Sequence, residues 1–241
     1  MKFVLRLVLL WIGLAQLGFA QDFGSERQAM VQIIIETTRQ TSDYTGIQEL
    51  GADVLEAMLT VPRHEFVPDD MKAYSYRDQP LPIGTGQTIS QPFIVALMTD
   101  LAELDKDSTV LEVGTGSGYQ AAILAQLASR VYTIEIIEEL GLKAKSVLEG
   151  LGYSNIFTRI GDGYHGWKEQ GPFDAIIVTA APESVPDALL EQLKPGGKLV
   201  IPVGKQSAVQ TLQVWHKDKR GKLSRTDVLP VGFVPLTRNR R

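Results

Sequence analysis

The chain has 241 residues, enough for one α/β domain with a buried core and a small appendage. Its net charge of −4 and pI near 5.5 argue against a nucleic-acid binder that neutralises phosphates, because such proteins carry a basic face. The absence of cysteine excludes thiol catalysis and cysteine zinc sites, and it leaves the compartment open. We therefore predict one domain, with no nucleic-acid partner and no metal.

Residues 1–20 have the layout of a secretory signal rather than of a folded segment. Lys2 and Arg6 precede the apolar stretch 7–17, and Gly18 and Ala20 place small residues at the positions that decide cleavage. The apolar stretch is shorter than the about 20 residues that a membrane span needs. We predict cleavage after Ala20, export to the periplasm or beyond, and a mature domain 21–241 without a membrane span.

Residues 25–76 are predicted to form a small helical cap. Apolar residues recur at helical spacing in two stretches, namely Met30, Ile33 and Ile34, then Val54, Leu55, Met58 and Leu59. No strand precedes these helices, so their apolar faces must be buried against the later domain. A cap over a ligand crevice would help to select the substrate.

Residues 77–92 are dense in proline, glycine and small polar side chains, and we predict a shaped loop there. Long loops inside a compact domain are often functional, although a surface connector is the alternative. Ser90-Gln91-Pro92 has the pattern of a helix start, with Ser90 as the cap of a helix from Phe93 to Leu104.

A buried strand, 110–113, runs into the glycine-rich turn 114–118 and then into a helical pattern, 119–128. Doubly wound sheets open their ligand crevice in this way, because glycines permit positive φ and a close approach of the backbone to the ligand. The run reads E-x-G-x-G-x-G, whereas the dinucleotide fingerprint requires G-x-G-x-x-G.

Two acids follow later strands of the same sheet. Strand 131–134 ends at Glu135, where an acid can accept hydrogen bonds from ribose hydroxyls, unless it is only an exposed strand end. Strand 155–160 leads to Asp162, which either accepts from the exocyclic amino group of a purine or is a turn residue, with Trp167 beside that ring. The predicted ligand is a nucleoside.

The remaining pattern completes a doubly wound, mostly parallel α/β sheet of Rossmann type with seven strands. The elements still to be placed are helix 138–150, strand 174–178, helix 186–193, a turn at 194–197 and strands 198–203, 211–216 and 228–234.

These motifs together resemble the protein-L-isoaspartate O-methyltransferases, a family of the class I S-adenosylmethionine-dependent superfamily. The resemblance covers nearly all of residues 30–236, and its most specific runs are 61–68 (VPRHEFVP), 80–92, 112–119, 161–164 (GDGY) and 233–236 (FVPL). It implies methyl transfer from S-adenosylmethionine to the free carboxylate of L-isoaspartyl residues in damaged proteins and peptides, which initiates their repair. We also predict that the chain acts as a monomer.

The resemblance assigns roles to individual residues. The active-site residue of the family corresponds to Ser90. Cofactor contacts fall on Glu112, Gly114, Thr115, Gly116, Gly118, Glu135, Asp162 and Gly163, and substrate contacts on Ile83, Gln87, Thr88, Ile89 and Thr179. A carboxylate is already ionised at neutral pH, so this chemistry needs no general base.

Two features depart from the family. Gly232 stands where a basic residue usually precedes the terminal Phe-Val-Pro-Leu run, and most members lack a leader, which makes a cytoplasmic location the alternative.

Four other functions compete with this interpretation. The glycine spacing disfavours a nicotinamide oxidoreductase, and Thr179-Ala180-Ala181-Pro182 with no cysteine disfavours a nucleic-acid methyltransferase. A non-catalytic cofactor-binding protein and a small-molecule O-methyltransferase remain as alternatives.

Overall fold

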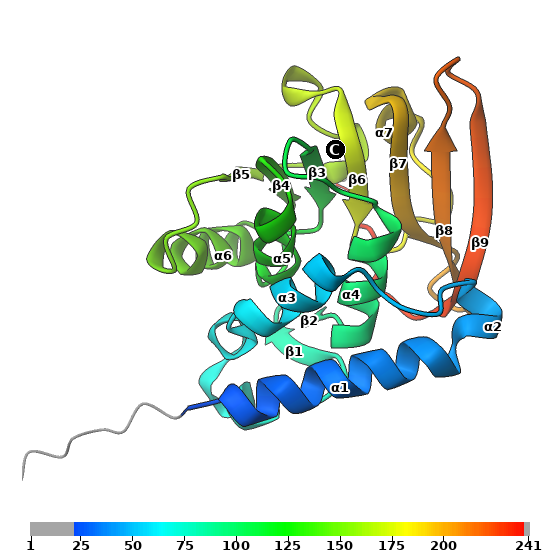
Figure 1. The fold of residues 1–241 in the computed structure, drawn as a ribbon. Helices are drawn as coiled ribbons and strands as arrows, with labels where there is room; N and C mark the ends of the chain where they lie inside the picture. The colour runs from blue at the N-terminus through cyan, green and yellow to red at the C-terminus, as the bar shows by residue number, and fades with distance from the viewer. Residues whose placement is uncertain (1–21, 239–241) are drawn as a thin grey trace, which may run out of the picture.

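The computed structural model describes residues 22–238, so the predicted leader lies outside the described residues. A seven-stranded sheet forms the centre (Figure 1), with the strand order β5-β4-β3-β6-β7-β8-β9. Its strands are β3 (Thr109–Val113), β4 (Arg130–Glu135), β5 (Ile156–Ile160), β6 (Phe173–Val178), β7 (Leu193–Val203), β8 (Gln210–Lys217) and β9 (Leu223–Val231). Only β8 runs antiparallel to its neighbours, which confirms the predicted doubly wound, mostly parallel α/β sheet.

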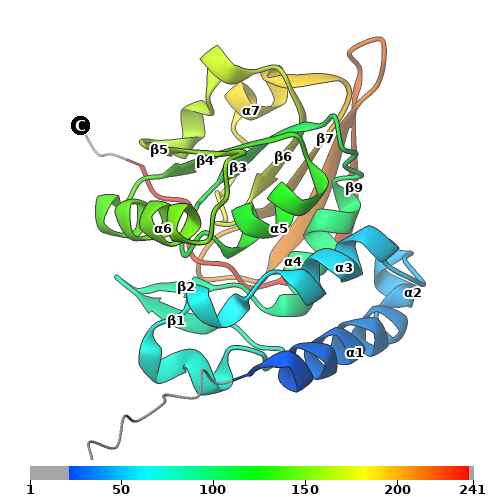
Figure 2. The same cartoon turned by 60° about the vertical axis from the view of Figure 1, so that its left-hand side comes forward.

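Helices cover both faces of the sheet (Figure 2). The larger layer holds α4 (Pro92–Leu101), α5 (Tyr119–Leu127) and α6 (Glu138–Gly150), and the short α7 (Asp187–Glu191) lies on the other side. Side chains alternate between the faces along β3: Val110 joins the core under the larger layer, and Leu111 joins the core on the α7 side. Both faces are buried, which explains why the central strands read as nearly continuous apolar runs.

The strand order reverses at β3. The chain passes from β3 outward to β4 and β5, and then returns to the other side of β3 to build β6 and β7. In an open parallel sheet, the loops at the carboxyl ends of the two central strands diverge at such a point and leave a crevice. The turns after β3, β4 and β6 therefore meet at one edge of the sheet.

The N-terminal helices pack mainly on other helices, and one of them also contacts the edge strand β9. They are α1 (Gly24–Gln40), α2 (Ser42–Thr45) and α3 (Ala52–Thr60), followed by the 3₁₀ turns η1 (Arg63–Phe66) and η2 (Asp69–Tyr74). Helix α1 contacts α3 and α4, and α3 also contacts α5, so the predicted cap thickens the helical layer. No helix within residues 22–238 has the length and apolarity to cross a membrane.

Several predicted boundaries were wrong at the far side of the sheet. Strand β9 begins at Leu223, five residues before the prediction, because polar side chains on both faces hide the pairing that its backbone makes with β8. The predicted turn 194–197 lies inside β7, where a Cβ on Gly197 would stand 2.8 Å from the Asp174 carbonyl oxygen of β6. Glycine is needed there for close approach rather than for turning.

The segment 77–92, predicted as a shaped loop, contains a β-hairpin of β1 (Leu81–Gly84) and β2 (Gln87–Ile89). Its two turn residues, Thr85 and Gly86, have φ of 50° and 73°, as a tight type I′ hairpin turn requires. The alternation of buried Leu81 and Ile83 with exposed residues is the strand signal, and it was obscured by the prolines and glycines around it.

Ser90 is not the cap of the following helix, contrary to the prediction. Helix α4 has Gln91 at its N-cap position without a side-chain cap bond, and it ends at Leu101 instead of Leu104. The cap comes from a distant residue, because Asp78 Oδ1 accepts a hydrogen bond from the Phe93 N–H at 2.8 Å and Asp78 Oδ2 accepts one from Gln91 Nε2. The Ser90 hydroxyl makes no hydrogen bond with any other described residue.

This arrangement predicts that Asp78→Ala destabilises the protein more than Ser90→Ala does. Losing the remote cap should lower the free energy of unfolding by about 1–2 kcal/mol, whereas removing the unbonded hydroxyl should change it by less than about 0.5 kcal/mol. Urea unfolding of both variants, followed by circular dichroism, measures the difference. Equal destabilisation by the two substitutions would contradict the assignment of the cap.

Candidate functional site

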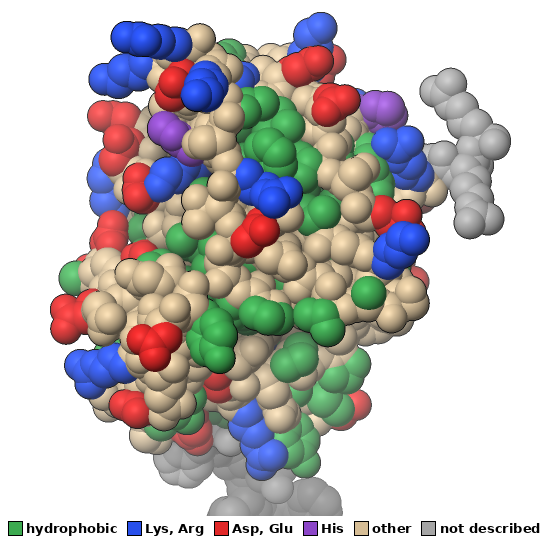
Figure 3. Space-filling view, turned by 90° about the vertical axis from the view of Figure 1, so that its right-hand side faces the viewer, with side chains coloured by type: hydrophobic (Ala, Val, Ile, Leu, Met, Phe, Trp, Pro, Cys, Tyr) green, Lys and Arg blue, Asp and Glu red, His purple; other side chains and the backbone are tan. Residues whose placement is uncertain are grey.

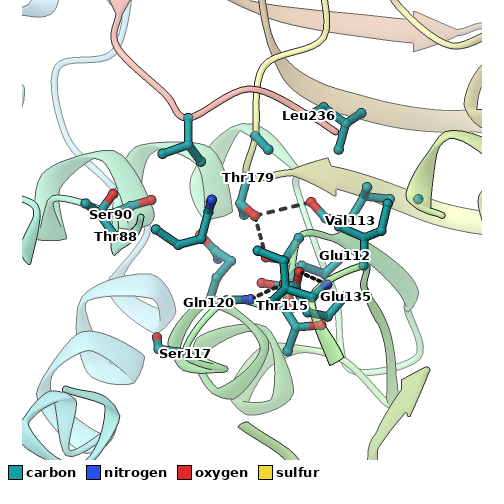
Figure 4. A pocket seen from close by; sticks show the side chains of 18 of the residues that line it. Thr88, Ser90, Glu112, Val113, Thr115, Ser117, Gln120, Glu135, Thr179 and Leu236 are labelled. Atoms are coloured by element: carbon teal, nitrogen blue, oxygen red, sulfur yellow. Dashed lines mark hydrogen bonds between the residues drawn. The ribbon is translucent and has the colours of Figure 1, made fainter. Parts of the chain in front are cut away.

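A pocket opens where the turns after β3, β4 and β6 meet (Figure 4). Ser90 and Thr88 lie on one side of it, and Glu112, Thr115 and Glu135 lie on the other. Its lining, listed in chain order, is Gln87, Thr88, Ile89, Ser90, Val95, Glu112, Val113, Gly114, Thr115, Gly116, Ser117, Tyr119, Gln120, Ile134, Glu135, Ile136, Ile137, Gly163, Thr179, Ala180, Val234, Pro235, Leu236 and Thr237. The pocket thus collects residues from across the chain.

The glycine turn takes the conformation that the sequence predicts. Gly114, Gly116 and Gly118 have φ of 101°, 53° and 89°. A Cβ on Gly114 would overlap the Thr179 hydroxyl, which donates a hydrogen bond to the Gly114 carbonyl oxygen. The turn is therefore pressed against the end of β6, and a side chain at position 114 would separate the two walls.

Glu135 joins the turn after β3 to the turn after its own strand. Its Oε2 accepts a hydrogen bond from the Gly116 N–H at 2.8 Å, and its Oε1 accepts one from the Ile137 N–H at 2.9 Å. The residue is 6% exposed, so the predicted alternative of an exposed strand end is wrong. Each oxygen keeps a further lone pair that can accept from a ligand hydroxyl.

Glu112 is a buried acid with one oxygen unsatisfied. Thr133 Oγ1 donates to its Oε2 at 2.5 Å, and Thr115 Oγ1 lies 2.6 Å from Thr133 Oγ1. The other oxygen, Oε1, has no hydrogen-bond partner among the described residues. Burial raises the pKa of Glu112 to about 8, helped by the nearby charge of Glu135. A cation placed at this acid would satisfy its free oxygen and favour its ionised form.

Some predicted site residues lie outside the pocket lining. Ile83 is buried behind the turn, where its Cδ1 packs near Gly116, and Gly118 starts α5 against Leu148. Asp162 is mostly buried, and its Oδ1 accepts a hydrogen bond from the Tyr164 N–H, while its neighbour Gly163 does line the pocket.

Trp167 does not lie beside the pocket, contrary to the prediction. Its ring packs edge-on against Tyr132 with centroids 5.4 Å apart, on the α7 side of the sheet.

The sequence interpretation missed several lining residues. Ser117 and Gln120 could have been predicted from their positions beside the start of α5, which follows the glycine turn. Gln120 Nε2 also donates a hydrogen bond to Thr99 Oγ1 of α4. No local pattern places the terminal segment 234–237 in the pocket, although 233–236 is one of the runs that resemble the family. Long-range hydrogen bonds with Ala181 and Tyr164 bring it to the end of β6.

A second groove begins at the Ser90 side of the pocket and runs toward the edge strand β9. It shares Thr88, Ser90, Thr179 and Val234 with the pocket. Its other lining residues are Thr37, Thr41, Pro80, Gln91, Phe93, Ile94, Val209, Leu229, Pro230, Val231, Gly232 and Phe233. No charged residue lines this part of the described surface. Figure 3 views the molecule from the side of β9, where hydrophobic and other uncharged side chains lie between scattered charged ones.

Comparisons with known proteins identify the family of this chain. Residues 39–241 match the family model described as protein-L-isoaspartate(D-aspartate) O-methyltransferase. The chain belongs to the protein-L-isoaspartate O-methyltransferase family. Among its relatives, protein-L-isoaspartate O-methyltransferase 2 of Syntrophobacter fumaroxidans is 54% identical over 96% of this chain and 95% of the relative. The protein of the same name from a Polaromonas species is 56% identical over 88% of this chain and 100% of the relative.

Solved structures of the family have the same architecture. One protein-L-isoaspartate O-methyltransferase superposes with a TM-score of 0.77 at 30% identity, covering 88% of this chain and 66% of that one. A putative protein-L-isoaspartate O-methyltransferase from Plasmodium falciparum, solved with S-adenosyl-L-homocysteine, gives a TM-score of 0.72 at 25% identity, over 88% and 99% of the two chains. Family membership therefore rests on sequence and fold together.

The buried acid predicts a pH-dependent stability for the ligand-free methyltransferase. Folded Glu112 keeps its proton up to about pH 8, whereas in the unfolded chain it ionises near the ordinary pKa of 4.5. The folded state therefore binds more protons between these values, and the free energy of unfolding falls as the pH rises through this window. Glu112→Gln cannot ionise, so its stability relative to the parent should increase between about pH 5 and about pH 8.

Urea unfolding at both pH values measures this effect. Glu139→Gln, which removes the same charge from an exposed position on α6, is the control. Parallel pH dependence in the parent and Glu112→Gln would refute the assigned protonation state.

Proposed function

We infer that this enzyme transfers a methyl group from S-adenosylmethionine to the free carboxylate of L-isoaspartyl residues in damaged proteins and peptides, with Ser90 as the residue that holds the acceptor. The reaction and its cofactor are inferred from family membership. The role of Ser90 is inferred from one observation: its unbonded hydroxyl lies at the junction of the pocket and the uncharged groove.

The pocket fits the cofactor through its acids and its glycine turn. We assign the unsatisfied Glu112 oxygen to the ammonium group of the cofactor, because a buried acid with a raised pKa gains most from a cation. Glu135 would receive the ribose hydroxyls, and the backbone of Gly163, which lines the pocket, would contact the base. When bound, S-adenosylmethionine supplies an electrophilic methyl group on a sulfonium ion.

The residues of the chain contribute position and desolvation rather than proton transfer. A carboxylate is ionised at neutral pH, and a sulfonium leaving group needs no proton, so neither a base nor an acid is required. Ser90 and Thr88 offer neutral hydroxyl donors to the acceptor, and the surrounding Ile89 and Val95 exclude water from it. Holding the attacking oxygen in line lowers the barrier by making the encounter effectively intramolecular.

The uncharged groove is proposed to receive the residues that flank the isoaspartyl site. It starts at Ser90 and continues past Phe93 to the end of β9, so a polypeptide substrate can lie along it while its carboxylate enters the pocket. A small-molecule acceptor would leave this surface unused. We therefore expect a flanked peptide to be a better substrate than an isolated β-linked dipeptide.

Ser90→Ala should lower kcat/KM for an L-isoaspartyl peptide by about tenfold or more, because a hydrogen bond to a charged group is worth roughly 1.5–3 kcal/mol. The Kd for S-adenosylhomocysteine should stay unchanged, since Ser90 lies across the pocket from the acids. Transfer of labelled methyl groups to matched L-isoaspartyl and L-aspartyl peptides, and to the β-linked dipeptide, measures the first effect. Calorimetry measures the second.

The matched control is Ser154→Ala, which removes an exposed serine hydroxyl between α6 and β5. Wild-type kcat/KM in Ser90→Ala would overturn the proposed role of this residue. Label on the L-aspartyl peptide, or on neither peptide, would overturn the proposed reaction.

We also propose that the protein is exported and cleaved after Ala20. The first buried side chain of the described fold is Phe23, whose ring packs against His64 with centroids 4.4 Å apart, so this cleavage would leave the anchored core intact. Fractionation of cells expressing the full-length chain, with sequencing of the mature N-terminus, should find Gln21 first in the exported fraction. An intact Met1 on a cytosolic protein would refute export.

A further inference from the structure

Arg63 is a fully buried cation that reaches the main chain of Ser90. It belongs to η1, and none of its side chain is exposed. Its Nη2 donates a hydrogen bond to the Ser90 carbonyl oxygen at 2.6 Å, and its Nε donates one to the Ser75 carbonyl oxygen at 2.8 Å. One guanidinium thus ties the residue proposed to hold the acceptor to a segment before the hairpin.

The same guanidinium lies over the ring of Tyr119, 4.7 Å from its centroid. Tyr119 directly follows the glycine turn, begins α5 and lines the pocket. Its position is set by its own element, because the turn and the helix are held by backbone hydrogen bonds such as Ala122 N–H to the Gly118 carbonyl oxygen. Tyr119 therefore offers Arg63 a fixed platform on the cofactor side of the pocket.

A buried guanidinium is a costly way to fill this space. No carboxylate among the described residues pairs with Arg63, and its Nη1 has no hydrogen-bond partner there. An apolar side chain of similar volume would avoid the cost of removing a charge from water. It could not donate hydrogen bonds to two carbonyl oxygens while stacking on an aromatic ring, as the planar guanidinium does. Its particular contribution is thus directional contact with the Ser90 backbone.

The Ser90 main chain needs such a restraint. Ser90 lies between the end of β2 and the N-cap of α4, and its hydroxyl makes no bond to the described protein that would orient it. Asp78 holds the next residues, Gln91 and Phe93, but does not reach Ser90.

We propose that Arg63 is a positioning residue for methyl transfer, which fixes the Ser90 backbone relative to the cofactor turn through the Tyr119 ring. This inference rests on the proposed role of Ser90 as the holder of the acceptor. Arg63 does not touch the acceptor itself, so its effect on turnover passes through Ser90.

A double-mutant cycle of Arg63→Met and Ser90→Ala tests the proposal, because residues that act through one another are not additive. Arg63→Met alone should lower kcat/KM for the L-isoaspartyl peptide by about tenfold, and by less than about twofold when Ser90 is already alanine. The Kd for S-adenosylhomocysteine, measured by calorimetry, should change by less than about threefold, since the glycine turn keeps its own hydrogen bonds. Arg63→Lys, which keeps the charge but not the planar fork, should recover only part of the loss.

The matched control is Arg27→Met. Arg27 also donates to main-chain carbonyl oxygens, those of Leu59 and Thr60, and lies 5.6 Å from the centroid of the Tyr76 ring, away from the pocket. All variants are assayed at a temperature where circular dichroism shows them folded, so that Arg27→Met reports the kinetic effect of losing a structural arginine. Its kcat/KM should match that of the parent.

The outcomes separate the two proposals. If Ser90→Ala is impaired and Arg63→Met lowers kcat/KM tenfold with either serine or alanine at position 90, the positioning role of Arg63 is refuted. The proposed role of Ser90 would then stand. Wild-type kinetics in Ser90→Ala would refute the role of Ser90 and the inference that depends on it. A large rise in the cofactor Kd of Arg63→Met would show that Arg63 supports the cofactor turn instead.

Discussion

The pocket depends on the two backbone hydrogen bonds that Glu135 accepts. Its carboxylate joins the Gly116 N–H of the turn after β3 to the Ile137 N–H of the turn after β4. This acid therefore links the two turns beyond the point where the backbone bonds of Gly114 and Thr115 to the Ile134 carbonyl oxygen end the pairing of β3 with β4. The positive φ of Gly116 turns its amide toward that acid, and the close contact of Gly114 with Thr179 then fixes the turn against β6. The positions of α5 and of the pocket walls follow from this connection.

The sheet and the cofactor side of the pocket could be predicted because their causes are local. Each central strand is buried on both faces and reads as an apolar run, and the residue after it lies at the carboxyl edge wherever the strand pairs. The glycine spacing likewise encodes the backbone conformation directly, since three positive φ values in five residues require glycine. Glu135 was placed correctly at the end of its strand for the same reason.

The acceptor side could not be predicted from local pattern because distant residues hold it. The cap of α4 comes from Asp78 rather than from the adjacent Ser90, and the Ser90 backbone is bound by Arg63, 27 positions earlier. The terminal residues around Pro235 are brought to the pocket by distant partners, because Ala181 makes backbone hydrogen bonds with Val234 and Leu236 and the Tyr164 hydroxyl donates to the Leu236 carbonyl oxygen. Nothing in a short window distinguishes such a partner from a solvated arginine or a loose tail. Local propensity correctly indicated a helix start near residue 92 and misassigned the side chain that caps it.

Charge divides the pocket in a way that suits methyl transfer to an anion. The acids Glu112 and Glu135 lie on the side proposed for the cofactor, whose sulfonium and ammonium groups are cationic, and no Lys, Arg or His among the described residues lines the pocket. The anionic acceptor instead meets neutral hydroxyls at Ser90 and Thr88. A lysine in contact with that carboxylate would stabilise it more than the transition state, in which its charge is being lost, and would slow the attack. The Arg63 guanidinium binds the Ser90 carbonyl oxygen. It therefore supplies positive potential to this wall without forming an ion pair with the nucleophile.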